Sequence, residues 1–363
     1  MGKQFLFIYL AMLNIACADN NDFSTLYKQG DYGYACFRIP TVITTNDGSI
    51  LAFAEARKMG CSDTGNIDIV LRKSIDNGET WSDVKIVWDD GDNVSGNPSP
   101  VIDRETGDIH LLSTWNNGQD KEADIIALKS IDTRRVFHQV SSDDGENWSA
   151  AKDITQTTKL SNWTWYATGP VHGIQLSKGP NKGRMIIASD HIEAHTDKYY
   201  SHIIYSDDHG DTWQLGGSSP NDQVNESTVA ELNNGDLILN MRNYDRQDAQ
   251  VRQIAISKDA GMTWQDQRYD RALPEPQCQG ALLTTKNDLL LFTNPADSNN
   301  RVNMTLSISR DQGKTWPDKI TLFDKHAAYS DLTELKDDRI IVLFEAGYET
   351  PYDGIHYKIL DVK

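Results

Sequence analysis

One eight-residue phrase recurs five times along this chain and constrains its fold more than any other feature. The phrase reads Ser-x-Asp-x-Gly-x-Thr-Trp, with Asn in place of Thr in the second copy. The copies are Ser74–Trp81, Ser141–Trp148, Ser206–Trp213, Ser257–Trp264 and Ser309–Trp316, and their tryptophans are 67, 65, 51 and 52 residues apart. A repeat at this spacing is typical of folds in which similar supersecondary units pack against one another in series.

Each copy has the chemistry of a turn between two strands. The Asp side chain can accept backbone N–H groups further along the turn, and the Gly provides a positive φ. The Trp is a large apolar anchor for the turn. Short β-branched or aromatic runs precede three of the copies, at Ile67–Leu71, Ile203–Tyr205 and Ile254–Ile256. We therefore interpret the repeat as structural.

These runs and turns predict an all-β fold, because no long stretch beyond the N-terminus shows the 3.6-residue apolar period of a helix. A β-propeller with four-stranded antiparallel blades fits the repeat length best. A calcium loop is the alternative for the Asp-rich stretch at Asp89–Asp92, but that stretch lacks the terminal Glu of such a loop. We expect no metal site there.

The first 18 residues are expected to be an export signal rather than part of the fold. They contain a Lys, then an apolar run from Phe5 to Ile15, then Ala16-Cys17-Ala18. Either a signal peptidase cleaves after Ala18, or Cys17 becomes the lipid-modified first residue of a lipoprotein. We expect one domain over residues 22–363, and a protein that is periplasmic, anchored to the outer membrane or secreted.

Three cysteines remain if Cys17 is used in export: Cys36, Cys61 and Cys278. An odd number does not make a disulfide framework. Cys36 and Cys61 could pair, but buried free thiols are the expectation we favour. His191 and His195 flank a Glu, yet a strand followed by a loop would not place them on one face, so we expect neither a metal nor any other cofactor.

The formal net charge of −18 disfavours nucleic acid and anionic membrane surfaces as partners. Arginines nevertheless stand in distinctive phrases. Phe37–Pro40 reads FRIP, and the hairpin that follows ends in Ala-Glu-Ala-Arg at Arg57. We call each copy of the repeated eight-residue phrase a box. The two arginine phrases together with the five boxes resemble the exo-α-sialidases, which are bacterial-type neuraminidases built on a six-bladed β-propeller. The resemblance runs from about Tyr32 to Lys358, and it implies a monomer acting on sialylated glycans.

Sialidases hold the carboxylate of sialic acid with three arginines, which stay charged and can form bidentate contacts. The matching positions are Arg38 in FRIP, Arg242 in ILNMRNYDR and Arg301 ahead of the fifth box. Arg246 and Arg310 are rivals of Arg301. The resemblance also places Arg57 at the rim of the pocket, near the 4-hydroxyl of the sugar.

The sugar carboxylate would repel a carboxylate nucleophile, and sialidases use a tyrosine that a neighbouring base deprotonates. The resemblance assigns Tyr329 of the YSDL phrase as nucleophile and Glu226 as its base. Asp63 matches the acid/base that protonates the leaving oxygen and later activates water, with Asp68 as its competitor. Glu345 matches the carboxylate that orients the first arginine. The implied reaction is hydrolysis with retained configuration.

Three aromatic residues in the segment Ser161–Leu176, namely Trp163, Trp165 and Tyr166, could either contact the glycan or pack in the core. Val171 and His172 stand where the family often has a second Gly, which leaves the local shape open. Two other functions remain open: a transferase or intramolecular trans-sialidase on the same scaffold, and a non-catalytic carbohydrate-binding propeller. The second would need none of the Tyr, Glu and Asp set.

Overall fold

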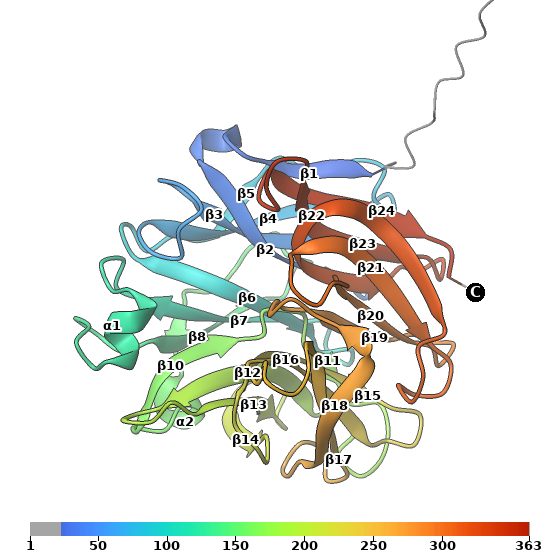
Figure 1. Ribbon diagram of the computed structural model, residues 1–363. Coiled ribbons are helices and arrows are strands. Elements are labelled where there is room, and N and C mark those ends of the chain that lie inside the picture. The colour runs from blue at the N-terminus through green and yellow to red at the C-terminus, as the bar shows by residue number, and fades with distance from the viewer. Residues whose placement is uncertain (1–22, 363) are drawn as a thin grey trace, which may run out of the picture.

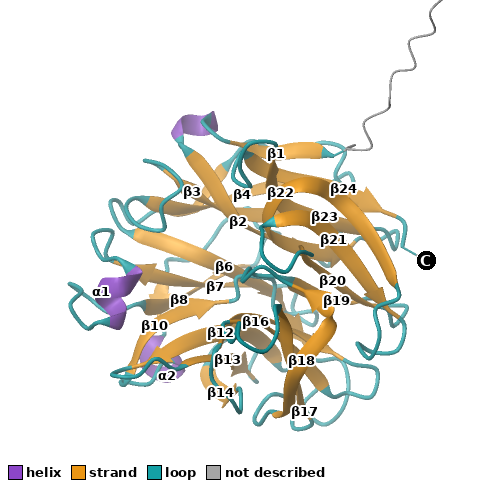
Figure 2. Ribbon diagram, in the orientation of Figure 1, coloured by secondary structure: helices purple, strands orange, loops and turns teal. Residues whose placement is uncertain are grey.

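The computed structural model describes residues 23–362, in which strands form six four-stranded antiparallel blades around a central hub (Figure 1). Three short helical segments, η1 (Asp31–Gly33), α1 (Glu122–Ile126) and α2 (Thr155–Thr158), lie outside the sheets (Figure 2). The predicted all-β propeller is confirmed. Each blade buries apolar side chains against its neighbours, as in the cluster of Val101, Leu112, Met185, Ile187 and Trp213.

The first four blades follow the chain in order. The first contains β2 (Cys36–Thr44), β3 (Ile50–Arg57), β4 (Ile67–Ser74) and β5 (Lys85–Trp88). The second contains β6 (Val94–Ile102), β7 (Ile109–Asn116), β8 (Arg135–Ser141) and β9 (Lys152–Asp153). The third contains β10 (Trp163–Thr168), β12 (Met185–Glu193), β13 (Tyr199–Ser206) and β14 (Gln214–Ser218), with β11 (Ile174–Gln175) beside β12. The fourth contains β15 (Val224–Glu231), β16 (Leu237–Asn243), β17 (Val251–Ser257) and β18 (Gln265–Pro274).

One long strand serves the last two blades. The first part of β22 (Asp318–Glu334) completes the fifth blade beside β19 (Ala281–Thr284), β20 (Leu290–Pro295) and β21 (Val302–Ser309). Its second part opens the sixth blade and pairs with β23 (Ile340–Gly347), which pairs with β24 (Gly354–Leu360).

The two ends of the described chain close the ring. Strand β1 (Ser24–Lys28) pairs antiparallel with β24, so that Ser24 lies opposite Tyr357 (Figure 1). Because the sequence contains no sixth box, it predicts that the two ends of the chain join to close the sixth blade, with residues 354–362 as one strand. The closure is confirmed, and β24 ends at Leu360. The blade completed in this way needs no sixth box.

All five boxes occupy the turn between the third and fourth strands of a blade. In the first copy, the Ser74 hydroxyl accepts the Gly78 N–H at 2.9 Å, and the Asp76 carboxylate accepts the Thr80 N–H at 2.9 Å. Gly78 has a φ of 86°, which favours glycine. The same contacts recur in the fifth copy, at Ser309 and Asp311. The box therefore fixes the outer turn of a blade.

Cys36 and Cys61 form a disulfide, with Cα atoms 5.2 Å apart, and Cys278 is a buried free thiol. The expectation of free thiols at Cys36 and Cys61 is wrong. Cys36 lies opposite Arg57 in the β2–β3 ladder, so the loop that follows Arg57 folds back over it. An odd number of cysteines argues against a framework of several disulfides, but it does not predict whether two particular cysteines form a single bond.

The expected export signal at residues 1–18, including Cys17, lies outside the described residues. Within residues 23–362, no helix has the length and apolar character that a membrane span requires.

Candidate active site

One pocket gathers charged side chains from every part of the chain at one end of the hub. Its volume is about 220 Å³. The charged residues that line it are Arg38, Arg57, Arg134, Arg242, Arg301, Glu55, Asp63, Glu122, Asp190 and Glu226. A larger cavity of about 680 Å³ is lined by the opposite ends of the same inner strands, at Thr44 of β2 and Thr333 of β22. We take the smaller pocket as the site because its titratable groups face one another.

Arg38 and Glu345 form a buried ion pair that joins the first and last blades. Arg38 donates from Nε and Nη2 to the two Glu345 oxygens, both at 3.1 Å. Glu345 also accepts the Ile39 N–H at 2.8 Å and the Tyr329 N–H at 3.2 Å. These four contacts fix the plane of the Arg38 guanidinium, which leaves Nη1 on the pocket side.

Tyr329, Glu226 and Arg242 are in direct contact at the pocket wall. The Tyr329 hydroxyl donates to Glu226 Oε1 at 2.6 Å, and Arg242 Nη1 donates to Glu226 Oε2 at 2.6 Å. Arg242 Nη1 also lies 3.4 Å from the Tyr329 hydroxyl. Burial raises the pKa of Tyr329 well above its usual value, and Glu226 raises it further, against the opposing charges of Arg242 and Arg301. The phenol is therefore protonated near neutral pH.

Arg301 reaches the same pocket from the loop between β20 and β21. Its Nη1 donates to the Tyr352 hydroxyl at 3.1 Å. The Tyr329 ring lies 4.9 Å from the Arg38 guanidinium carbon and 5.7 Å from that of Arg301. The two rival arginines lie elsewhere: Arg246 donates to Glu275, and Arg310 contacts Asp318.

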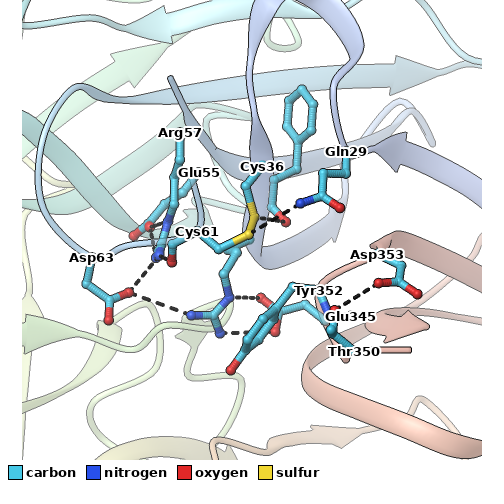
Figure 3. The surroundings of a disulfide bond; sticks show 12 residues. Gln29, Cys36, Glu55, Arg57, Cys61, Asp63, Glu345, Thr350, Tyr352 and Asp353 are labelled. Carbon is cyan, nitrogen blue, oxygen red and sulfur yellow. Dashed lines mark hydrogen bonds and ion pairs between the residues drawn. A yellow bond between two sulfur atoms is a disulfide. The ribbon is translucent and has the colours of Figure 1, made fainter. Parts of the chain in front are cut away.

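Asp63 lies on the loop between β3 and β4, at the mouth of the pocket. Its Oδ1 is 2.7 Å from Arg57 Nη1 and 3.6 Å from Arg38 Nη1 (Figure 3). The Asp63 side chain is exposed, but the surrounding pocket walls limit its hydration, which by itself would raise its pKa. Arg57 and Arg38 outweigh this effect and lower the pKa of Asp63. Its competitor Asp68 is fully buried in β4, where it accepts the Tyr34 hydroxyl at 2.5 Å.

Arg57 differs from its expected place. It was expected at the rim, but only 2% of its surface is exposed, and it donates twice to Glu55. It lines the wall of the pocket beneath Asp63.

Sequence reasoning missed several polar residues of the pocket. Arg134 is buried, and its guanidinium carbon lies 4.0 Å from the Trp165 ring centre. Asp190 is fully buried, and neither of its oxygens has a hydrogen-bond partner among the described residues. Burial and the charge of Glu226 raise the pKa of Asp190 well above its usual range, which favours the protonated form of this pocket-lining carboxyl. No phrase in the sequence marks either residue.

Tyr352 was also missed, although a signal existed. It lies seven residues after Glu345, on the connection that leads from β23 to β24, so its approach to Arg38 could have been inferred from the FEAGY phrase. Its ring centre is 4.2 Å from the Arg38 guanidinium carbon.

Of the three aromatic residues in the segment Ser161–Leu176, two pack in the core and one lines the pocket. Trp163 and Tyr166 pack in the core of the third blade, where Trp163 stacks on His191 at 3.4 Å. Trp165 alone of the three lines the pocket. Among residues 23–362 no cluster of three metal-ligating side chains occurs, and His191 Nδ1 instead lies 3.0 Å from His202 Nδ1.

The fold and the pocket together define a class of protein: propellers with the repeated Ser-x-Asp-x-Gly-x-Thr-Trp box in the outer turns of their blades and an arginine-lined pocket at the hub. The BNR repeat-like domain profile matches residues 48–342. The chain is 31% identical over 342 residues to a sialidase of Bacteroides fragilis, covering 88% of this chain and 61% of that protein. It is 30% identical to an exo-alpha-sialidase of Arthroderma benhamiae, covering 87% of this chain and 79% of that protein. The chain belongs to the sialidase family.

Solved structures of sialidases have the same fold. A Hadza microbial sialidase superposes with a TM-score of 0.84 at 28% identity, covering 94% of this chain and 68% of that one. An intramolecular trans-sialidase from Ruminococcus gnavus shares the fold with a TM-score of 0.79 at 18% identity, covering 93% and 97%. The chain spans 61% of the Bacteroides relative and 52% of a sialidase from Micromonospora viridifaciens.

Proposed function

We propose that this chain is an exo-α-sialidase that hydrolyses terminal sialic acids from glycans with retention of configuration. The observation that carries the proposal is the 2.6 Å contact between the Tyr329 hydroxyl and Glu226 in a pocket lined by Arg38, Arg242 and Arg301. A binding module would need the arginines, but it would have no use for a buried phenol paired with a base.

The arginines supply the specificity for an anion. Arg38, Arg242 and Arg301 come from three different blades, and Arg38 and Arg242 are each already paired with a glutamate. Guanidinium groups held in this way can receive a planar carboxylate without reorganising. In a protein with a net charge of −18, they also concentrate positive potential where an anionic sugar must bind.

Tyr329 is the proposed nucleophile. A neutral phenol approaches the anomeric carbon beside the substrate carboxylate without the repulsion that a carboxylate nucleophile would meet, and sialidases with a tyrosine nucleophile are a recognised exception to the two-carboxylate pattern. Glu226 takes the phenol proton as the C–O bond forms, and the adjacent Arg242 stabilises the phenolate charge that develops.

Asp63 is the proposed acid and base. It gives a proton to the departing glycosidic oxygen and later takes one from the water that cleaves the tyrosyl–sugar bond. Because Arg57 and Arg38 lower the pKa of Asp63, little of its carboxyl group is protonated near neutral pH, and the protonated fraction becomes larger only under acidic conditions. Substrates with poor leaving groups should therefore be hydrolysed best under acidic conditions.

A fluorogenic 4-methylumbelliferyl sialoside tests the activity, and mass analysis of the product from sialyllactose tests the reaction type. The proposal expects fluorescence and free sialic acid. An anhydro sugar or a sialylated acceptor would instead show an intramolecular or intermolecular transfer. If no sialic acid or aglycone were released from any sialoside, the enzymatic function would be refuted. A non-catalytic carbohydrate-binding propeller would then be the remaining function.

An exported location remains a further proposal. The Cys36–Cys61 disulfide supports it, since such bonds persist mainly in oxidising compartments. Fractionation of the source cells, followed by immunodetection of the chain, would test it. Recovery in the cytoplasm alone would contradict it.

A further inference from the structure

The loop that carries Asp63 has few contacts besides those of Arg57 and the disulfide. The Ser62 and Thr64 hydroxyls contact each other within the loop, and the Gly65 N–H donates to the Gly118 carbonyl at 2.9 Å, beyond Asp63. Gly60 and Gly65 bracket the segment with φ angles of 149° and 101°, and a Cβ at either position would meet open space. The Asp63 side chain is 74% exposed. A short segment between two such glycines can adopt many backbone conformations, so it does not hold an acid in one place by itself.

The disulfide supplies the missing anchor. Cys61 lies two residues before Asp63 and is bonded to Cys36, which begins β2 two residues before Arg38 (Figure 3). One covalent bond therefore joins the loop of the acid to the strand that carries the first arginine. Strand β2 is buried along its whole length, which makes it a rigid support.

A second connection runs from Cys61 to Asp63 through Arg57. Arg57 Nη1 donates to the Cys61 carbonyl at 2.6 Å and lies 2.7 Å from Asp63 Oδ1. Glu55 fixes the other side of the same guanidinium with bonds of 3.0 and 2.6 Å. The position of the Cys61 backbone thus sets both the start of the acid's segment and the orientation of its ionic partner (Figure 3).

We propose that the Cys36–Cys61 disulfide is a positioning element for acid/base catalysis by Asp63, and that its two cysteines act through the loop and Arg57. This inference rests on the proposed function and extends it. When the bond is cut, Arg38, Arg242 and Tyr329 keep their contacts, because Glu345 and Glu226 hold them without the loop. Arg301 likewise keeps its contacts with Tyr352 and Gln277. Proton transfer by Asp63 is impaired in both steps, to the leaving group and from the attacking water.

The leaving group separates this role from a general structural one. A nitrophenolate departs without a proton, whereas the sugar alcohol of sialyllactose requires one. Misplacing a catalytic group by about 1 Å can cost roughly a hundredfold in rate. The quantity kcat/KM reports the steps up to departure of the leaving group, so the later role of Asp63 as base does not affect it. We therefore expect the Cys36→Ser/Cys61→Ser variant to lose about ten- to a hundredfold in kcat/KM on sialyllactose and little in kcat/KM on p-nitrophenyl sialoside.

Reduction of the folded wild-type protein provides the second measurement if the variant folds poorly. A dithiol such as dithiothreitol transfers two electrons and two protons, so that the disulfide becomes two thiols and the reagent a cyclic disulfide. Alkylation and mass analysis count the two new thiols. The same selective loss on sialyllactose should follow. The double variant is the control, because reductant should leave its rates unchanged.

The Asp63→Ala variant shows how the rates on the two substrates change when the acid is lost completely. The Cys36→Ser/Cys61→Ser variant and the reduced wild-type protein should show the same selective loss on sialyllactose, but a smaller one. An equal loss on both substrates, or full activity on sialyllactose after complete reduction, would overturn the positioning role while leaving the proposed function intact. A wild-type protein that hydrolyses neither substrate would instead refute the proposed function, and the inference with it.

Discussion

Glu345 accepts four hydrogen bonds while fully buried, so replacing it with Gln should affect both stability and substrate binding. The amide keeps one acceptor oxygen, which can still receive Arg38 Nε and the Ile39 N–H. Its NH₂ group would face Arg38 Nη2 and the Tyr329 N–H, which are both donors. The variant loses two hydrogen bonds and leaves the charge of Arg38 without its buried partner.

The magnitude follows from that geometry. Removing one member of a buried ion pair costs about 3–5 kcal/mol in the free energy of unfolding. For a folded domain of this size, such a loss lowers Tm by about 4–7 °C. A guanidinium that is no longer held in plane also binds the substrate carboxylate less well, and losing one charge-assisted contact should raise KM roughly tenfold or more.

Thermal unfolding and steady-state kinetics on the fluorogenic sialoside measure the two effects. Glu334→Gln is the matched control, because its carboxylate is half-buried and its Oε2 accepts the Lys286 N–H at 2.9 Å. We expect the control to change both quantities little. If Glu345→Gln matched the control in Tm and in KM, the structural role given to the Arg38–Glu345 pair would be wrong.

Three further outcomes follow from the contacts of the site and the core. Tyr329→Phe should reduce kcat on an aryl sialoside by several orders of magnitude, and near-normal turnover would show that another group attacks. Arg242→Lys cannot reproduce the contacts of a guanidinium fork, so KM should rise sharply; an unchanged KM would remove Arg242 from the carboxylate clamp. Burial lowers the pKa of His138 to about 3, with the neighbouring His110 adding to the effect. The unfolded chain therefore binds the proton first, and stability should fall as the pH drops below about 6.5, by up to roughly 1.4 kcal/mol per pH unit for this group. Urea unfolding at a series of pH values should give a free energy of unfolding that depends less steeply on pH in His138→Asn than in wild type. Equal dependence on pH would contradict the lowered pKa of His138.

The fold was readable from the sequence because its signals are local and repeated. Each box specifies its turn by contacts within eight residues, so the five copies predicted the blades and their outer turns. The strands around Ile67, Ile203 and Ile254 were predicted for the same reason. The closing pair of β1 and β24 followed from the absence of a sixth box.

The site was only partly predictable. Arg38, Glu226 and Tyr329 stand in phrases that mark them, and the structure brings them to one pocket. Arg134 and Asp190 owe their places to burial and to neighbours from other blades, which no local pattern records. The disulfide was missed because its formation depends on how the loop after Arg57 folds back, and counting cysteines does not reveal that distance.

The long-range pairing of Arg38 with Glu345 has a consequence for how catalytic competence arises. The two residues are 307 positions apart, and they belong to the first blade and to the last, which the β1–β24 pair completes. During synthesis, Arg38 exists long before its partner has been made, and a lone arginine is costly to bury. The clamp and the closed ring should therefore form together. A chain that stops before β23 would lack Glu345, so the proposed sialidase activity would appear only after the polypeptide is complete through β23 and its ring has closed.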